Sequence, residues 1–460
     1  MNTLALATVI VLIALGGFYV GRGRALRLAG GNIRSLHSLP GYHGFYVTLW
    51  CGLPTLVLLL IWFAFEPVII RHLVIADLSV ALRELAPGRL ALLYNDIRNT
   101  AEGAVTSSAA DAAVQSAAVH YMRLKETGQW AVTALALAIA AAGFAYARAR
   151  IVPALRVRPR VEKVVMATLI LCSTLAIFIT IGIVLSLLFE SIRFFEKVSI
   201  MEFLFGLQWS PQTALRADQV GSSGAFGAVP VFTGTLLITF IAMLVAGPIG
   251  LMSAIYMAEY ASPRTRAWVK PVLEILAGIP TVVFGFFAAL TVAPAIRVAG
   301  QWLGLDVASE SALAAGLVMG IMIIPFVSSL SDDVINAVPQ TMRDGSYALG
   351  ATKSETVRLV LIPAALPGIV ASFLLAVSRA IGETMIVVMA AGLAAKLTAN
   401  PLEAVTTVTV QIVTLLVGDQ EFDSAKTLAA FALGLMLFCV TLALNILALR
   451  IVQKYREEYE

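Results

Sequence analysis

Three ionisable residues lie inside otherwise apolar segments of the chain: Glu274, Arg379 and Glu383. On a helix, Arg379 and Glu383 would lie one turn apart on the same face. A guanidinium offers paired, planar donors to an oxyanion, and a nearby carboxylate can offset its charge and fix its orientation. We therefore predict that Arg379 contacts an anionic substrate and that Glu383 positions Arg379. The alternative is an ion pair that only fastens this segment to its neighbours.

Other familiar chemistries find no support in the residue patterns. Gly345 and Gly350 imitate the front of a P-loop, but Ala351 and Thr352 follow where a lysine and a hydroxyl would have to reach the phosphates and magnesium. The histidines and cysteines lack the spacing of metal ligands or of a disulfide framework, and we interpret the histidines as surface or interface residues. The histidines are His37, His43, His72 and His120, and the cysteines are Cys51, Cys172 and Cys439. We expect no cofactor, no metal and no enzymatic site, so the chain should be powered from outside itself.

The composition indicates a polytopic membrane protein. Of the 460 residues, 59% are hydrophobic and only 13% are charged, which is more apolar surface than a soluble core of this size needs. The net charge of +4 does not indicate nucleic-acid binding, because the basic residues gather in short loops between apolar runs, as the positive-inside rule expects. We predict an all-α fold with about nine transmembrane helices, since each apolar run has roughly the 20 residues that a bilayer requires.

The first part of the chain predicts three spans, at 4–20, 46–70 and 130–146. Uncharged residues precede the first span and arginines follow it, so we expect an uncleaved helix with the N-terminus outside. The mixed-charge segment 71–129 should form short helices in the periplasm or at the membrane surface. A basic, proline-containing linker then places the chain in the cytoplasm, and we set a domain boundary between residues 160 and 161. Residues 1–160 are expected to pack around the core, or alternatively to dock a regulator.

After the linker, the pattern predicts a core of six spans, at 164–189, 231–257, 271–294, 312–330, 368–393 and 427–451. Counting sides puts the C-terminus in the cytoplasm and segments 191–230, 297–311 and 396–426 outside. Arg379 and Glu383 then lie about 18 and 24 Å along their span at 1.5 Å per residue, where a charge costs about 3 kcal/mol. Glu274 instead lies near a predicted helix start beside Lys270, which favours an interfacial or dipole role.

The polar loop between the fourth and fifth of these spans, 332–366, has a distinct pattern. Residues 340–349 should form one short helix that Gly350 stops in a left-handed conformation. Thr352 and Glu355 form a capping-box pattern that starts a second helix, which Pro363 should end. Four residues of the first helix share one face with little bulk at its centre, and such a face can seat closely in another protein's groove. They are Met342, Gly345, Ser346 and Leu349.

This loop resembles the "EAA" loop of ABC importer permeases, E-A-A-x3-G-x9-I-x-L-P, which as a class inserts a coupling helix into the ATP-hydrolysing subunit. Gly350 and Pro363 match in spacing, and Val360 and Ile362 take the apolar positions. Asp344-Gly345-Ser346 replaces Glu-Ala-Ala, which keeps acid, small, small but weakens the helix at Gly345. The resemblance implies that residues 342, 344–346, 349, 350 and 363 couple the chain to an ATPase.

Four further segments, FLFGLQWSP, GAVPVFTGTLL, EILAGIPTVVFGFF and SRAIGETM, are similar to permeases of phosphate ABC importers, and the match runs from about Val161 to the C-terminus. The resemblance implies an inner-membrane permease subunit that works with a second permease chain, two ATPase subunits and an extracytoplasmic phosphate-binding protein. Phosphate suits the predicted pair, because it keeps an O–H that can donate to Glu383, whereas sulfate would be repelled.

Two other functions stay open. The substrate of such an importer could be sulfate, molybdate or a phosphonate, which sequence separates poorly. The chain could instead be an ion-coupled secondary transporter or channel in which Arg379 and Glu383 form a proton relay. That alternative leaves the cytoplasmic loop without a partner, and no second intramembrane charge pair occupies a corresponding half.

Overall fold

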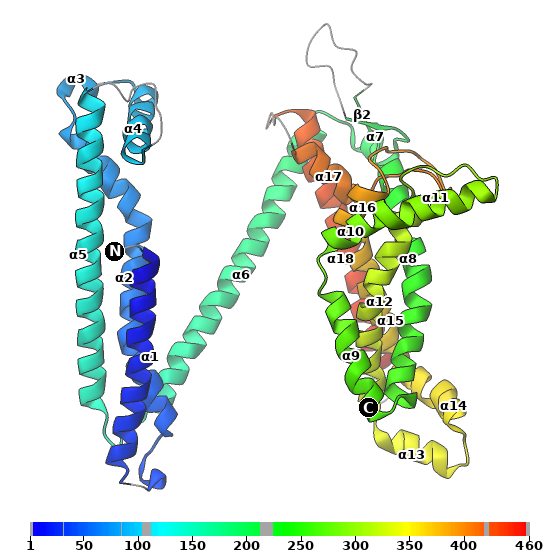
Figure 1. Ribbon diagram of the computed structural model, residues 1–460, viewed down its shortest axis with the longest axis horizontal. Helices are drawn as coiled ribbons and strands as arrows, with labels where there is room; N and C mark the ends of the chain where they lie inside the picture. Colours follow the sequence, from blue (N-terminus) through cyan, green and yellow to red (C-terminus); the bar gives the residue numbers. More distant parts are fainter. Residues whose placement is uncertain are drawn as a thin grey trace. The chain divides into compact units, whose positions relative to one another are not determined.

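The computed structural model describes residues 3–30, 32–83, 85–103, 112–211, 224–417 and 423–456. Apart from one two-stranded ladder, the regular elements of this part of the chain are helices (Figure 1). Nine of the described helices are long and apolar enough to cross a membrane, which confirms the predicted all-α membrane fold. The predicted outer segments include residues 104–111, 212–223 and 418–422, which lie outside the described residues, as do residues 1, 2 and 457–460.

The chain divides into two compact units, Met1–Ile177 and Phe178–Glu460. The division falls inside one continuous helix, α6 (Val157–Phe195). The predicted boundary between residues 160 and 161 lies near the start of the same helix and stays a prediction. Each unit is described by itself below.

The N-terminal unit contains three long helices, α1 (Thr3–Leu28), α2 (Pro40–Asp77) and α5 (Ala112–Arg150), with α2 packed against both others. Short elements η1 (Ile33–Ser35), α3 (Val80–Arg83) and α4 (Pro87–Ala101) join them, and α4 packs on α5. Gly143 lets α5 approach α2 closely, because a Cβ there would lie 2.1 Å from the Trp50 carbonyl oxygen. Residues 112–129, predicted to belong to short helices in the periplasm or at the membrane surface, instead form the first part of the long helix α5.

The C-terminal unit has its core where α8 (Val229–Ile255) packs along α12 (Ala312–Ala337). Met319 and Ile323 of α12 are fully buried there. Before α8 come α7 (Ile200–Phe205) and the antiparallel strands β1 (Trp209–Ser210) and β2 (Ala225–Phe226). The π-helical turn η2 (Tyr256–Tyr260) follows α8.

The predicted span at 271–294 is wrong in its bounds. One helix, α9 (Pro263–Ala277), starts earlier, and a break at Gly278–Pro280 separates it from α10 (Thr281–Phe287), the π-helical η3 (Ala288–Val292) and α11 (Ala293–Trp302). Pro280 lacks a backbone N–H and disfavours a helical conformation for the residue before it, which favours a break at this point. Of residues 263–302, only the later part, Thr281–Trp302, qualifies as a membrane span.

The remaining elements begin with α13 (Gln340–Ala348), which confirms the predicted first loop helix. They continue with α14 (Lys353–Thr356), the π-helical η4 (Val357–Leu361), α15 (Ile362–Ile381), α16 (Met385–Ala390), α17 (Val408–Leu416) and α18 (Ala425–Arg456). The prediction that Pro363 ends a helix is wrong. It occupies the first turn of α15, directly after a π-helical turn, where its missing N–H is tolerated.

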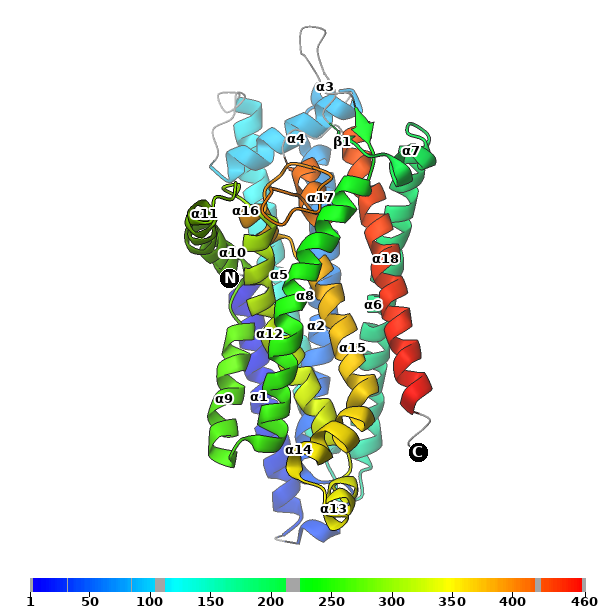
Figure 2. The same ribbon diagram turned by 90° about the vertical axis from the view of Figure 1, so that its right-hand side faces the viewer.

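Both views place α13 and the C-terminal end of α18 at the same end of the C-terminal unit, while α11, α16 and α17 lie at the other end (Figures 1 and 2). This arrangement agrees with the sequence prediction that the loop and the C-terminus share one side of the membrane.

Candidate functional site

One buried arginine anchors the loop helix α13. The Arg343 side chain is 10% exposed and faces the Glu259 carboxylate, which is 7% exposed, at an Nε–Oε1 distance of 3.1 Å. Its Nη1 and Nη2 donate to the carbonyl oxygens of Val338 and Ile335 at 2.5 and 2.8 Å. These carbonyls belong to the end of α12, where unpaired acceptors and the helix dipole favour a cation. Arg343 therefore ties α13 to both α12 and η2.

The four residues predicted as one docking face are divided by the structure. Met342 and Ser346 are half-buried, and the Ser346 hydroxyl lies 2.9 Å from the Thr356 hydroxyl of the same chain. Gly345 and Leu349 point outward, and Leu349 is 90% exposed. A Cβ added to Gly345 would meet nothing within 4 Å. The outward surface of α13 and its C-cap thus includes Gly345, Leu349 and the exposed Asp344.

The turn after α13 has the predicted conformation. Gly350 has a φ of +85°, a left-handed value that glycine adopts without strain. Thr352 and Glu355 form a complete capping box, in which the Thr352 hydroxyl accepts from the Glu355 N–H and the Glu355 carboxylate accepts from the Thr352 N–H. This turn fixes the angle between α13 and the helix that leads into α15.

Arg379 and Glu383 lie at a break between helices rather than inside one span, so the predicted helix through both residues is wrong. Helix α15 ends at Ile381, with Gly382 as its C-cap. Arg379 is in the last turn of α15, near the end of the candidate span Lys353–Ile381 and not at its centre. Its side chain is exposed in the single chain, and its guanidinium carbon lies 5.6 Å from the ring centre of Phe326 on α12.

Glu383 binds backbone groups instead of Arg379. Its Oε1 accepts from the N–H groups of Met385 and Ile386 at 3.0 and 3.4 Å, at the start of α16. Its carbonyl oxygen accepts from the Thr409 hydroxyl at 2.8 Å. Among the described residues, the structure records no salt bridge between Glu383 and Arg379, because the helix ends before Glu383 and removes the i,i+4 geometry. Glu383 therefore shapes the break between α15 and α16, and Arg379 lies on the rim of that break.

Sequence reasoning missed a buried ionic cluster that joins α9 to α12. Asp332 is fully buried, and its carboxylate accepts from Arg266 at 2.8 Å and from Lys270 at 3.2 Å. Asn336 donates to the same carboxylate at 2.9 Å. Burial alone would lower the pKa of Lys270, but its hydrogen bonds to Asp332 and Asp333 raise that pKa above its ordinary value. Two features of the sequence could have indicated this cluster. The Asp332–Asp333 pair stands at the end of an apolar run, and the segment that contains Arg266 and Lys270 is basic.

Two other predictions about single residues need correction. Glu274 lies in the last turn of α9, not near a helix start, because the helix begins at Pro263. It is exposed and lines a cavity of about 210 Å³ together with Lys270 and Phe326. The histidines were predicted to lie at the surface or at an interface, but His43 is fully buried in the N-terminal unit. His120 lies 3.7 Å from the carboxylate of Asp77.

Comparison with known proteins identifies two regions of the chain. Residues 7–179 match a family described as "Phosphate ATP-binding cassette transporter", and residues 246–457 match "Binding-protein-dependent transport system inner membrane component". A probable ABC transporter permease protein, YqgH of Bacillus subtilis, is 33% identical over 303 residues, which are 65% of this chain and 92% of that protein.

The phosphate transport system permease protein PstC 1 of Mycobacterium tuberculosis is 32% identical over 283 residues, which are 56% of this chain and 83% of that protein. Among solved structures, a chain of a bacterial ABC transporter involved in the import of alginate is 15% identical. The match has a TM-score of 0.43 and covers 65% of this chain and 99% of that one.

Proposed function

We propose, from the premise that this chain belongs to the PstC-like permeases of the binding-protein-dependent transport system inner membrane component family, that its substrate is phosphate. Membership makes the chain a multi-pass inner-membrane permease subunit of an ABC importer. Permeases of this family have no ATPase site of their own and work with ATPase and binding-protein partners.

One observation carries the choice of phosphate. Two separate regions agree: the N-terminal match, residues 7–179, is described by phosphate transport, and the C-terminal region is about 30% identical to permeases named for phosphate transport. We infer partners of matching specificity, namely an extracytoplasmic phosphate-binding protein, a second permease chain and two ATPase subunits. We also propose that the N-terminus lies outside and that α13 and the C-terminus lie in the cytoplasm.

Coupling to the ATPase subunit is assigned to α13 and the turn at Gly350. The proposal is supported by a helix that is held to its own chain on one side through Arg343 and carries a leucine that is 90% exposed on the other. An exposed leucine beside the bare backbone of Gly345 suits a groove in a partner. Movement of that partner on ATP binding would then reach α12 through the contacts of Arg343.

The anion pathway is assigned to the break between α15 and α16. Arg379 is exposed in the single chain at the end of an apolar span, beside Phe326 and the break that Glu383 shapes. We infer that it faces the second permease chain and the pathway between the two, where its planar fork can bind a phosphate oxygen. Glu383 would hold α16 in place and present its remaining carboxylate oxygen to the O–H that phosphate keeps.

Transport in cells that lack their own phosphate importer tests this function. The full set of subunits should restore uptake of radiolabelled phosphate, and excess unlabelled phosphate should compete while sulfate and molybdate should not. Competition by sulfate or molybdate instead would move the substrate to another oxyanion. Uptake that continues without the ATPase subunits and follows the proton gradient would favour a secondary transporter.

A further inference from the structure

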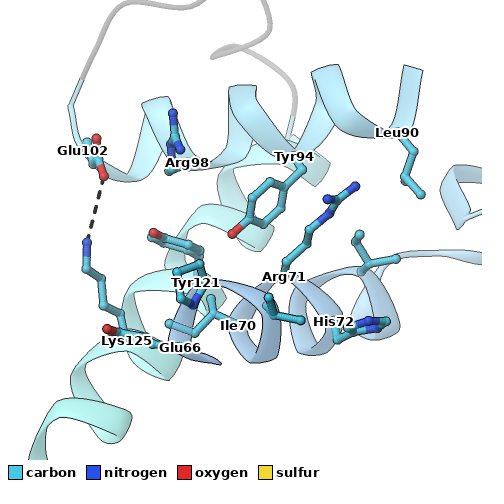
Figure 3. Close-up of a pocket in the computed structure, with 13 residues that line it drawn as sticks. Glu66, Ile70, Arg71, His72, Leu90, Tyr94, Arg98, Glu102, Tyr121 and Lys125 are labelled. Atoms are coloured by element: carbon cyan, nitrogen blue, oxygen red, sulfur yellow. Dashed lines mark ion pairs between the residues drawn. The ribbon is translucent and has the colours of Figure 1, made fainter. Parts of the chain in front are cut away.

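The N-terminal unit contains a cavity of about 800 Å³ that the proposed transport function does not use. Its lining comes from the end of α2, from α4 and from α5 (Figure 3). The lining residues lie toward the end of α2 and toward the start of α5, on the side that we propose to be extracytoplasmic. The cavity lies within a single compact unit.

Three cations from three different helices line the cavity. Arg71 comes from α2, Arg98 from α4 and Lys125 from α5. Two carboxylates, Glu66 and Glu102, also line it, so the lining has a net charge of one positive before His72 is counted (3 − 2 = +1). Within the described residues, a salt bridge is recorded for Lys125 with Glu102 at 3.9 Å, but for neither Arg71 nor Arg98. Two guanidinium groups are thus available to an anion.

Two tyrosines add hydrogen-bond donors between these cations. Figure 3 shows Tyr94 and Tyr121 in the space where α4 faces α2 and α5. The guanidinium carbon of Arg71 lies 5.8 Å from the ring centre of Tyr94, which orients the arginine at the cavity wall. Burial raises the pKa of Tyr94, so its hydroxyl stays protonated and can donate.

We infer that this cavity binds a phosphate group, held by Arg71 and Arg98 through charge-assisted hydrogen bonds and by the Tyr94 hydroxyl. Arginine forks match the geometry of phosphate oxygens, and a phenol adds a neutral donor. The group could belong to free orthophosphate or to a phospholipid headgroup, because Ile70 and Leu90 give the same cavity an apolar side. The inference concerns a site in the N-terminal unit and does not depend on which anion the core transports.

Binding to the full-length chain in nanodiscs of phosphatidylcholine tests the inference with two probes. The first is radiolabelled orthophosphate at equilibrium. The second is phosphatidylglycerol, offered in mixed vesicles and detected on the protein by native mass spectrometry. Arg71→Gln and Arg98→Gln should each lower the affinity of the protein for one of these probes by at least about tenfold, equivalent to roughly 1.4 kcal/mol. Loss of orthophosphate identifies a free anion, and loss of the lipid identifies a headgroup.

Arg89→Gln is the matched control, because Arg89 is an exposed arginine of the same helix, α4, that does not line the cavity. It should bind both probes as the parent does. Tyr94→Phe keeps the packing and removes only the hydroxyl, so it should weaken binding without changing the melting temperature. The inference is overturned if neither probe binds or if Arg89→Gln loses as much as Arg71→Gln. It also fails if Arg379→Gln abolishes orthophosphate binding that Arg71→Gln retains, with no lipid bound.

Discussion

Replacing Arg343 with methionine should uncouple ATP hydrolysis from transport. The substitution keeps an apolar stem of similar length but leaves the Glu259 carboxylate buried without its partner and removes donors from the carbonyls of Ile335 and Val338. Breaking a buried ion pair by removing one partner costs about 3–5 kcal/mol, against about 0–1 kcal/mol for an exposed pair. Because both side chains are at most 10% exposed, the larger range applies.

A loss of about 3 kcal/mol would lower the equilibrium constant for anchoring α13 by roughly a hundredfold. In a reconstituted complex, ATPase activity should then persist while its stimulation by substrate and uptake both fall. Arg264→Met is the control, because Arg264 is an exposed arginine of α9 and lies outside the coupling loop. The reasoning would be refuted if Arg343→Met and Arg264→Met transported equally well.

Substitutions at Gly350, Arg379 and Asp332, each with a comparison variant, test the remaining claims. Gly350→Val forces a branched side chain into a left-handed conformation at a cost of at least about 1 kcal/mol and should weaken co-purification of the ATPase. Gly350→Asn should weaken it less, because asparagine tolerates that conformation; equal yields of the two variants would contradict this. Arg379→Gln should abolish phosphate uptake with the complex intact, and Arg379→Lys should rescue it poorly because the fork is lost; uptake by the glutamine variant would end the claim that Arg379 binds substrate. Asp332→Asn should lower the melting temperature, because it removes on the order of 3 kcal/mol from the free energy of unfolding. The Asp333 side chain is 64% exposed, so Asp333→Asn should remove about 1 kcal/mol or less. Similar melting temperatures for the two variants would show that burial does not set the cost.

Local sequence patterns predicted the loop well because its structure depends on neighbouring residues. The left-handed stop at Gly350 and the capping box at Thr352 and Glu355 each involve groups within a few positions of one another. Their outcome therefore follows from backbone sterics and capping hydrogen bonds alone. The apolar runs likewise predicted the membrane spans, since length and hydropathy are properties of the segment itself.

The breaks inside apolar runs could not be predicted in the same way. Hydropathy treats Gly368–Leu393 as one span, yet the chain turns at Gly382 because Glu383 caps α16 and Thr409 binds the Glu383 carbonyl. That arrangement needs α17, which lies beyond the predicted span. The Arg343–Glu259 contact joins positions 84 residues apart, so no local pattern reports it. The sequence singled out Arg379 and Glu383, which we propose for the substrate pathway, by their residue types. Their geometry depended on tertiary contacts that the sequence does not report.

ATP hydrolysis by the complete complex in proteoliposomes tests the central claim most directly. Phosphate and sulfate, each loaded on its own extracytoplasmic binding protein, should be compared at equal concentration on the same preparation. The account predicts that the phosphate-loaded protein stimulates hydrolysis together with phosphate uptake into the vesicles, and that the sulfate-loaded protein does neither. Stimulation by sulfate, or phosphate uptake that proceeds without ATP, would contradict the assignment of this chain as the permease of a phosphate importer.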